Sequence, residues 1–236
     1  GVPNCCESGD CLDDGDATTS QWTNSDGGSF QNGSNWNTVN PPNQNMTAIL
    51  ELDATYTITF DSSAQTLNLL IQTGNPTFEI GDHVYTAAAD DNTLIIGDKP
   101  GNAASLTVNS GELVVGSGPT GSAELVLGYD PQSLGHLLLD GNSTSMRVYR
   151  LQAGDRGSGM VQIANGASLE TEKVDLGDGI GSTGYLILTE TSLLSCEEEF
   201  SVNRGTALIQ SPAELYFNDP YAPMQIFKNG NLGGDG

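Results

Sequence analysis

The chain has 236 residues, of which 30 are Asp or Glu and only 7 are Lys or Arg, so its formal net charge at pH 7 is −23. This charge excludes electrostatic capture of nucleic-acid phosphates or of anionic membrane surfaces, and no run of 18 apolar residues is present to span a membrane. The length fits one large all-β domain with an additional cap, and the acidity fits cation binding, a salty medium or simple solubility.

Residues 1–46 are predicted to form a cysteine-bearing arm followed by an irregular aromatic cap. Residues 1–20 are acidic and small, whereas residues 21–46 carry Trp22, Phe30 and Trp36 among Gly, Asn and Ser. We expect these aromatic side chains to cover the first coil of the domain that follows. The alternative is that Trp22 and Trp36 are exposed and stack on the faces of sugar rings.

The cysteines favour an oxidising, extracellular setting, because three of the four lie close together near the start of the chain: Cys5, Cys6, Cys11 and Cys196. Adjacent cysteines rarely bridge each other, so one of the first two is expected to bridge Cys11. A zinc site is the alternative, but no His lies near and the spacing does not match paired Cys-x-x-Cys motifs. Cys196 is either a buried free thiol or half of a disulfide to another molecule.

Residues 47–217 are predicted to form a β-solenoid, because pairs of short apolar runs recur along them. Residues 55–60 alternate cleanly between polar and apolar and should be the strand that enters it. The two runs of each pair are separated by a turn-forming residue, at Gly74, Gly111, Gly141, Gly166, Thr191 and Pro212. The last five of these turns are 30, 25, 25 and 21 residues apart.

A third element lies between these pairs and has the form apolar, any, apolar, Gly, acidic. Residues 94–98, 151–155 and 174–178 fit it closely, residues 125–130 fit it with one insertion, and residues 200–203 are a degenerate copy. Three strands per repeat make one coil of a parallel β-helix, with alternate side chains pointing into a narrow core. The sequence therefore predicts an all-β fold, a right-handed, three-sided parallel β-helix of about six coils with an irregular N-terminal cap. An antiparallel β-sandwich is the alternative.

The acidic residues of the third element are candidate metal ligands: Asp98, Asp130, Asp155 and Asp178. Stacking of the coils would place neighbouring carboxylates about 5 Å apart, where they repel unless a cation lies between them. Calcium accepts such oxygens, so Ca²⁺ is the expected ion. The alternative is that these are turn residues bonded to their own backbone. At the other corner, Asn109, Asn142 and Asn165 are expected to link the coils by hydrogen bonds.

No catalytic constellation stands out, so we expect the chain not to be an enzyme. Arg150 and Arg156 flank one third element beside Asp155, which is thin evidence for a polysaccharide lyase or hydrolase. His83 and His136 are isolated, and no nucleophile, phosphate-loop or dinucleotide motif is present. Three Asn-x-Ser/Thr triplets are candidate glycosylation sites, at Asn32, Asn45 and Asn142. Residues 218–236 are predicted to form a closing segment and a tail.

The repeats resemble those of secreted bacterial β-helix proteins, in particular autotransporter passengers and planctomycete-type extracellular repeat proteins. The resemblance covers about residues 20–217 and rests on the segments 22–36, 113–118, 125–128 and 181–188. It implies a secreted or cell-surface location and a surface, matrix or adhesive role.

The expected function is that of an extracellular structural protein that assembles head-to-tail with copies of itself into a filament, sheath or surface layer. The alternative is a carbohydrate-binding or adhesive surface module, for which polysaccharide would be the partner.

Overall fold

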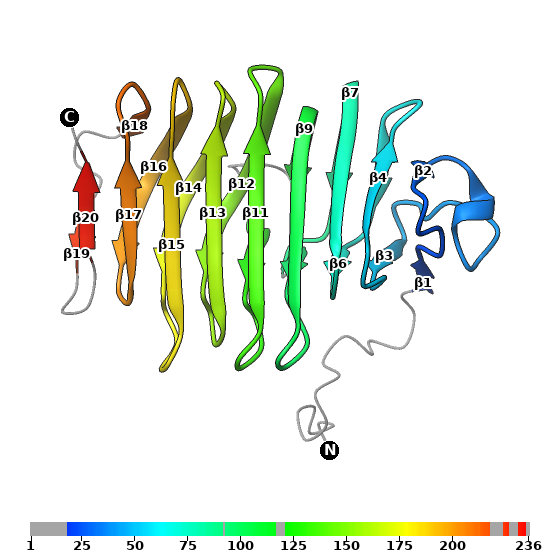
Figure 1. Ribbon diagram of the computed structural model, residues 1–236, viewed down its shortest axis with the longest axis horizontal. Helices are drawn as coiled ribbons and strands as arrows, with labels where there is room; N and C mark the ends of the chain where they lie inside the picture. The colour runs from blue at the N-terminus through cyan, green and yellow to red at the C-terminus, as the bar shows by residue number, and fades with distance from the viewer. Residues whose placement is uncertain (1–17, 92, 117–120, 218–223, 227–230, 235–236) are drawn as a thin grey trace.

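The computed structural model describes residues 18–91, 93–116, 121–217, 224–226 and 231–234, and these form a parallel β-solenoid of about eight turns (Figure 1). Every strand pair among them is parallel, and the one antiparallel feature is an isolated bridge between Trp22 and Trp36. The predicted fold class is therefore confirmed, and the β-sandwich is excluded. Within the described part of the chain, no helix has the length and apolarity needed to cross a membrane.

The strands stack into three faces. The first face contains β1 (Thr18–Gln21), β3 (Met46–Leu50), β6 (Leu69–Ile71), β8 (Leu94–Ile96), β10 (Glu124–Leu127), the second parts of β12 (Thr144–Ala153), β14 (Ser168–Leu176) and β16 (Leu193–Val202), and β19 (Met224–Ile226). The second face contains β2 (Gly28–Ser29), β4 (Thr55–Thr59), the first parts of β7 (Asn75–Ala87) and β9 (Ala103–Val115), β11 (Leu134–Asp140), β13 (Ser158–Ala164), β15 (Thr183–Leu188), β17 (Gly205–Ile209) and β20 (Asn231–Gly234). The third face contains β5 (Ala64–Thr66), the remaining parts of β7, β9, β12, β14 and β16, and β18 (Glu214–Phe217).

The core follows from the pleat, which sends alternate side chains inward on each strand. On the second face, one inward position is occupied turn after turn by Leu106, Leu137, Val161, Leu186 and Ala207, which are in register and fully buried. Each fully buried Leu or Val of this kind contributes about 1.5–3 kcal/mol to folding. The stacked repeats therefore build one continuous apolar interior along the rod.

Glycine is required at the start of the second face, where Gly135, Gly159, Gly184 and Gly205 stack in register. A β-carbon on Gly184 would lie 2.3 Å from the carbonyl oxygen of Ala153 in the preceding turn. The corner between the first and second faces can therefore be this tight only where the residue has no side chain.

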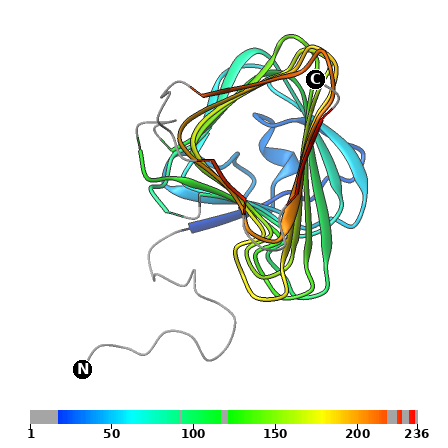
Figure 2. The ribbon, with the colours of Figure 1, turned by 90° about the vertical axis from the view of Figure 1, so that its left-hand side faces the viewer.

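Near the N-terminus the core is wider and aromatic. Trp22, Phe30 and Trp36 are buried, and the ring of Trp36 lies 5.1 Å from that of Phe30 and 5.1 Å from that of Trp22, in edge-to-face contacts. Seen along the rod, the turns near the N-terminus enclose a wider section than the orange turns near the C-terminus (Figure 2). A 3₁₀ turn, η1 (Gly33–Asn35), lies in this aromatic region.

The structure corrects three details of the sequence-based prediction. The solenoid has about eight turns instead of six and extends beyond 47–217, because β1 and β2 already pair with β3 and β4, and β19 and β20 continue the ladders. These end strands lack the repeated motif and were therefore missed. Gly74 lies at the corner before the second face, so Gly81, not Gly74, is the counterpart of Gly111. The degenerate copy at 200–203 is confirmed, since Phe200 is in register with Val174.

Candidate functional site

The four aspartates predicted as metal ligands do follow the first face at successive corners, and glutamine and arginine side chains lie among them. The amide nitrogen of Gln72 donates to Asp98 at 2.9 Å. That of Gln152 donates to Asp155 at 3.3 Å and to Asp178 at 3.4 Å, so it bridges two turns.

The guanidinium group of Arg156 lies at the same corner, 3.5 Å from the carboxylate of Asp155 and 4.0 Å from that of Asp130. It also sits 4.7 Å from the ring centre of Tyr129, in a cation–π arrangement. The carboxylates are therefore compensated in part by protein groups. Burial raises the pKa of Asp98 despite the Gln72 hydrogen bond, and it raises the pKa of Asp155 despite Arg156.

A calcium site is not evident from this geometry. Among the residues that the structure describes, no three His, Cys, Asp or Glu side chains gather closely enough to hold a metal ion. The physical reason is that the corner aspartates follow one another along the rod, with Gln72, Gln152 and Arg156 among them, and do not converge on a point. Calcium binding stays a prediction.

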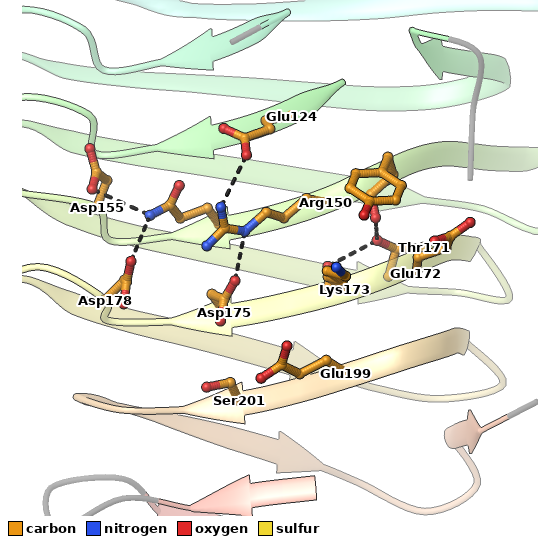
Figure 3. A network of polar contacts seen from close by, with 12 residues as sticks. Glu124, Arg150, Asp155, Thr171, Glu172, Lys173, Asp175, Asp178, Glu199 and Ser201 are labelled. Carbon is orange, nitrogen blue, oxygen red and sulfur yellow. Dashed lines mark hydrogen bonds and ion pairs between the residues drawn. The ribbon is translucent and has the colours of Figure 1, made fainter. Parts of the chain in front are cut away.

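The most extensive polar network lies on the outer side of the first face, where Glu124, Arg150, Lys173 and Glu199 occupy equivalent positions in four successive turns (Figure 3). Arg150 donates to Glu124 of the preceding turn at 3.0 Å and to Asp175 of the following turn at 2.7 Å. Burial lowers the pKa of Arg150, but its bonds to Asp175 and Glu124 outweigh this and raise the pKa overall. Arg150 therefore links three successive turns through ion pairs with a carboxylate on each side.

Lys173 continues this network toward the third face. Its ammonium group lies 3.2 Å from the carboxylate of Glu198 and 5.3 Å from the ring centre of Tyr149. The Lys173 pair is more exposed than the Arg150 pairs, so it contributes less to stability.

Cys196 is a free, fully buried thiol in register with Thr171 of the preceding turn. The hydroxyl of Thr171 lies 3.0 Å from the carbonyl oxygens of Tyr149 and Lys173, where β14 passes from the third face to the first. The thiol of Cys196 lies 3.4 Å and 3.1 Å from the carbonyl oxygens of Glu172 and Glu199. It therefore donates to the backbone at the equivalent bend one turn later. Of the two alternatives for Cys196, the structure shows the buried free thiol, whose sulfur has no exposed surface from which to reach another molecule.

Cys5, Cys6 and Cys11 lie outside the described residues. Burial raises the pKa of the Cys196 thiol to about 12, which keeps it protonated and unreactive at neutral pH.

The predicted sugar platform is also wrong. Trp22 is 0% exposed and Trp36 is 2% exposed, because both indoles pack into the aromatic end of the core. Their ring nitrogens are also satisfied internally, since that of Trp22 donates to the carbonyl of Asn24 at 2.6 Å and that of Trp36 to the carbonyl of Phe30 at 2.8 Å. Neither ring face is free to stack on a sugar, and both residues act as the cap that the sequence predicted.

The remaining predicted sites lie on the surface. Asn32, Asn45 and Asn142 are all exposed, which makes the three triplets accessible to a glycosylating enzyme. Of the asparagines expected to stack at the other corner, Asn165 donates to the carboxylate of Asp140 in the preceding turn, and not to another asparagine.

The strand edges at the two ends of the solenoid differ. At the N-terminal end, the backbone N–H of Asn37 donates to the carbonyl of Gln21 at 2.9 Å, and that of Thr23 donates to the carbonyl of Asn35 at 2.8 Å. Residues 35–37 therefore cover the end of β1 at Gln21, whereas β2 and β5 each pair with one strand only. At the C-terminal end, β18 and β19 each pair with β16 and β20 pairs with β17, and no described strand lies against their outer edges.

Comparison of the chain with protein-family models, with curated proteins and with solved structures finds no match in any of the three. The functional argument therefore depends on the residues of this chain alone.

Proposed function

We propose that the chain is a structural protein of the cell exterior, a stiff β-solenoid rod that joins other copies through its C-terminal strand edges. The observation that carries this proposal is that no described strand lies against the outer edges of β18, β19 and β20. Within the rod, each turn binds the next by parallel main-chain hydrogen bonds. Main-chain hydrogen bonds can also join an edge without a partner to an edge of another molecule, and two identical edges that face each other pair antiparallel.

The construction of the rod supports a mechanical role. Its core is continuous and apolar, and its charged side chains link neighbouring turns, as Arg150 does with Glu124 and Asp175. Such a solenoid resists bending because each turn contacts its neighbours over three faces.

A head-to-tail contact, as the sequence led us to expect, would use the outer edges of β1, β2 and β5, each of which pairs with one strand only. Because Asn37 already bonds to Gln21 at the end of β1 and Asn35 to Thr23 just beyond it, a second molecule would have to displace that segment at this point. Two C-terminal edges can meet without displacing any strand that the structure describes. This difference favours association through the C-terminal end. Two rods joined in this way form a closed pair, whereas head-to-tail contacts form an open filament.

The proposed extracellular location is supported by the acidic composition and by three exposed glycosylation triplets at Asn32, Asn45 and Asn142. The predicted cysteine-bearing arm of residues 1–20 would suit an oxidising medium.

Sedimentation velocity over a series of protein concentrations, combined with electron microscopy, tests the proposal. The salt concentration should be about 0.15 M, where charges are screened beyond about 8 Å and the net charge of −23 opposes contact less. We expect the mass to double with concentration and the images to show rods joined at one end.

A pair of matched variants locates the contact. Tyr216 on β18 is 57% exposed, and Val39 near the capped end is 74% exposed. Tyr216→Lys should weaken association at least tenfold, since charged side chains protect strand edges, whereas Val39→Lys should leave it unchanged. A protein that stays monomeric at every concentration, or an equal effect of both variants, would contradict the proposal.

A further inference from the structure

A shallow hollow opens to solvent where β15 and β17 begin on the second face. It is lined by side chains and backbone of two successive turns, namely Ser182, Thr183, Tyr185, Arg204, Gly205 and Thr206. Its floor depends on glycine, because a β-carbon on Gly205 would lie 2.1 Å from the carbonyl oxygen of Gly184. The hollow thus exists where the glycine column brings two turns of backbone together.

Arg204 is the distinctive group in this hollow. Each of the other arginines has a carboxylate partner, since Arg147 pairs with Glu112, Arg150 with Glu124 and Asp175, and Arg156 with Asp155. Among the described lysines and arginines, Arg204 alone has no carboxylate of a described residue within 4.0 Å.

The guanidinium group of Arg204 is held in position by backbone. One terminal nitrogen donates to the carbonyl of Gly179 at 2.9 Å and lies 3.3 Å from that of Asp178. Its other two nitrogens form no hydrogen bond with the residues that the structure describes. An arginine anchored on one side and available on the other is suited to a planar anion such as a carboxylate.

The other side chains of the hollow add an aromatic surface and hydroxyl groups. Tyr185 is 42% exposed and is in register with Thr206 of the next turn. The hydroxyls of Thr183, Tyr185 and Thr206 have no hydrogen-bond partner within the described part of the chain. Aromatic faces pack against the apolar faces of sugar rings, and free hydroxyls exchange hydrogen bonds with sugar hydroxyls.

We propose that this hollow binds an acidic saccharide, with Arg204 contacting the carboxylate of a uronic acid and Tyr185 packing against the sugar ring. A shallow, open site fits a stretch of polymer that crosses the surface better than it fits a small molecule that must be enclosed. The net charge of −23 opposes an anionic ligand at long range, but charges beyond about 8 Å are screened at physiological salt, and Arg204 dominates at contact. The proposal is independent of association at the C-terminal edge.

Titration calorimetry with three probes tests the proposal: an oligogalacturonate, the same oligomer with its carboxylates methyl-esterified, and inorganic sulfate. We expect the oligogalacturonate to bind at least tenfold more tightly than either of the others. Equal binding of the esterified oligomer would show that no carboxylate is recognised, and equal binding of sulfate would show that no ring is recognised. Either result, or no binding of oligogalacturonate, would overturn the proposal.

Variants then assign the site. Arg204→Gln and Tyr185→Ala should each weaken oligogalacturonate binding at least tenfold, while Arg147→Gln, which removes an exposed arginine elsewhere on the rod, should leave it unchanged. Arg204→Lys should retain part of the affinity, because it keeps the charge and loses the planar donors. Melting temperatures of all variants check that the fold is intact. Loss of binding in Arg147→Gln to the same extent as in Arg204→Gln would contradict the assignment.

Discussion

The two ends of the solenoid achieve burial with different side chains. At the N-terminal end, the core is an aromatic cluster in which the ring of Phe30 lies 5.0 Å from that of Phe60 and 5.5 Å from that of Tyr85, and residues 35–37 cover the end of β1 at Gln21. Beyond the middle, the core is mainly Leu, Ile and Val, with Phe200 and Phe217 paired at 6.1 Å near the C-terminal end.

The comparison shows how closing an end differs from continuing a repeat. Large rings fill the wider N-terminal turns. These rings and the segment that bonds to the end of β1 close this end of the solenoid. Aliphatic side chains of similar size repeat from turn to turn and give a narrower section that can be extended by another strand. The predictions below test whether the aromatic end is the more sensitive of the two.

The largest effect is expected from Trp22→Ala. The side chain is fully buried, and its ring nitrogen donates to the carbonyl of Asn24, so removal should cost about 3–5 kcal/mol of unfolding free energy. Thermal unfolding followed by circular dichroism measures the loss, with exposed Val39→Ala as the control. A variant that melts with the control would show that the aromatic end is not essential.

The aliphatic repeat gives the matching test. Leu176→Ala removes a fully buried side chain from the first face and should cost about 2–5 kcal/mol. Urea unfolding of this variant, compared with Trp22→Ala, tells which region limits stability. A smaller loss of unfolding free energy in Trp22→Ala than in Leu176→Ala would show that the aliphatic repeat, and not the aromatic end, is the more sensitive region.

The polar network should contribute less than either core position. Arg150→Ala leaves Glu124 and Asp175 without their partner in a half-buried setting, so we expect a loss of about 1–2 kcal/mol, between the values of exposed and buried pairs. Arg147→Ala removes a more exposed pair with Glu112 and should cost less than about 1 kcal/mol. Chemical unfolding of both variants measures the difference, and equal losses would disprove the role of Arg150 in joining turns.

Alkaline pH should produce the most gradual effect. The pKa of Cys196 is raised by burial from an ordinary 9.0 to about 12, so above pH 9 the unfolded chain loses a proton that the fold retains. Burial also raises the pKa of Tyr56 and of Tyr85, so all three groups make stability fall as the pH rises past about 9–10.

The thiol can be followed directly. With Cys5, Cys6 and Cys11 replaced by Ser, the folded protein should react slowly with a thiol reagent at pH 8 and quickly in urea. Fast reaction of the folded protein would show that Cys196 is accessible.

The fold could be predicted from the sequence in the segments that repeat a motif. Residues 174–178, for example, have the glycine and the acidic residue at the same positions as residues 151–155. The prediction missed β1, β2, β19 and β20, since end strands are held by pairing and need not repeat a motif. The burial of Trp22 and Trp36 agrees with the prediction that their rings cover the first coil.

The site residues were harder to predict because they depend on register. Glu124 and Asp175 lie 26 and 25 residues from Arg150, which is about one repeat, but only the alignment of turns shows that they meet. The neighbours of Arg204 could not be found from composition, since the hollow forms where two turns of backbone approach each other at Gly184 and Gly205.

The central claim is that the turns stack in parallel with the register described, and engineered cysteine pairs test it most directly. In a chain with Cys5, Cys6 and Cys11 replaced by Ser, Leu138→Cys with Gln162→Cys places two outward residues opposite each other on β11 and β13. We expect this pair to form an intramolecular disulfide on mild oxidation. Leu138→Cys with Ile187→Cys, two turns apart, should not. The reverse result, or equal cross-linking of both pairs, would contradict the parallel stack.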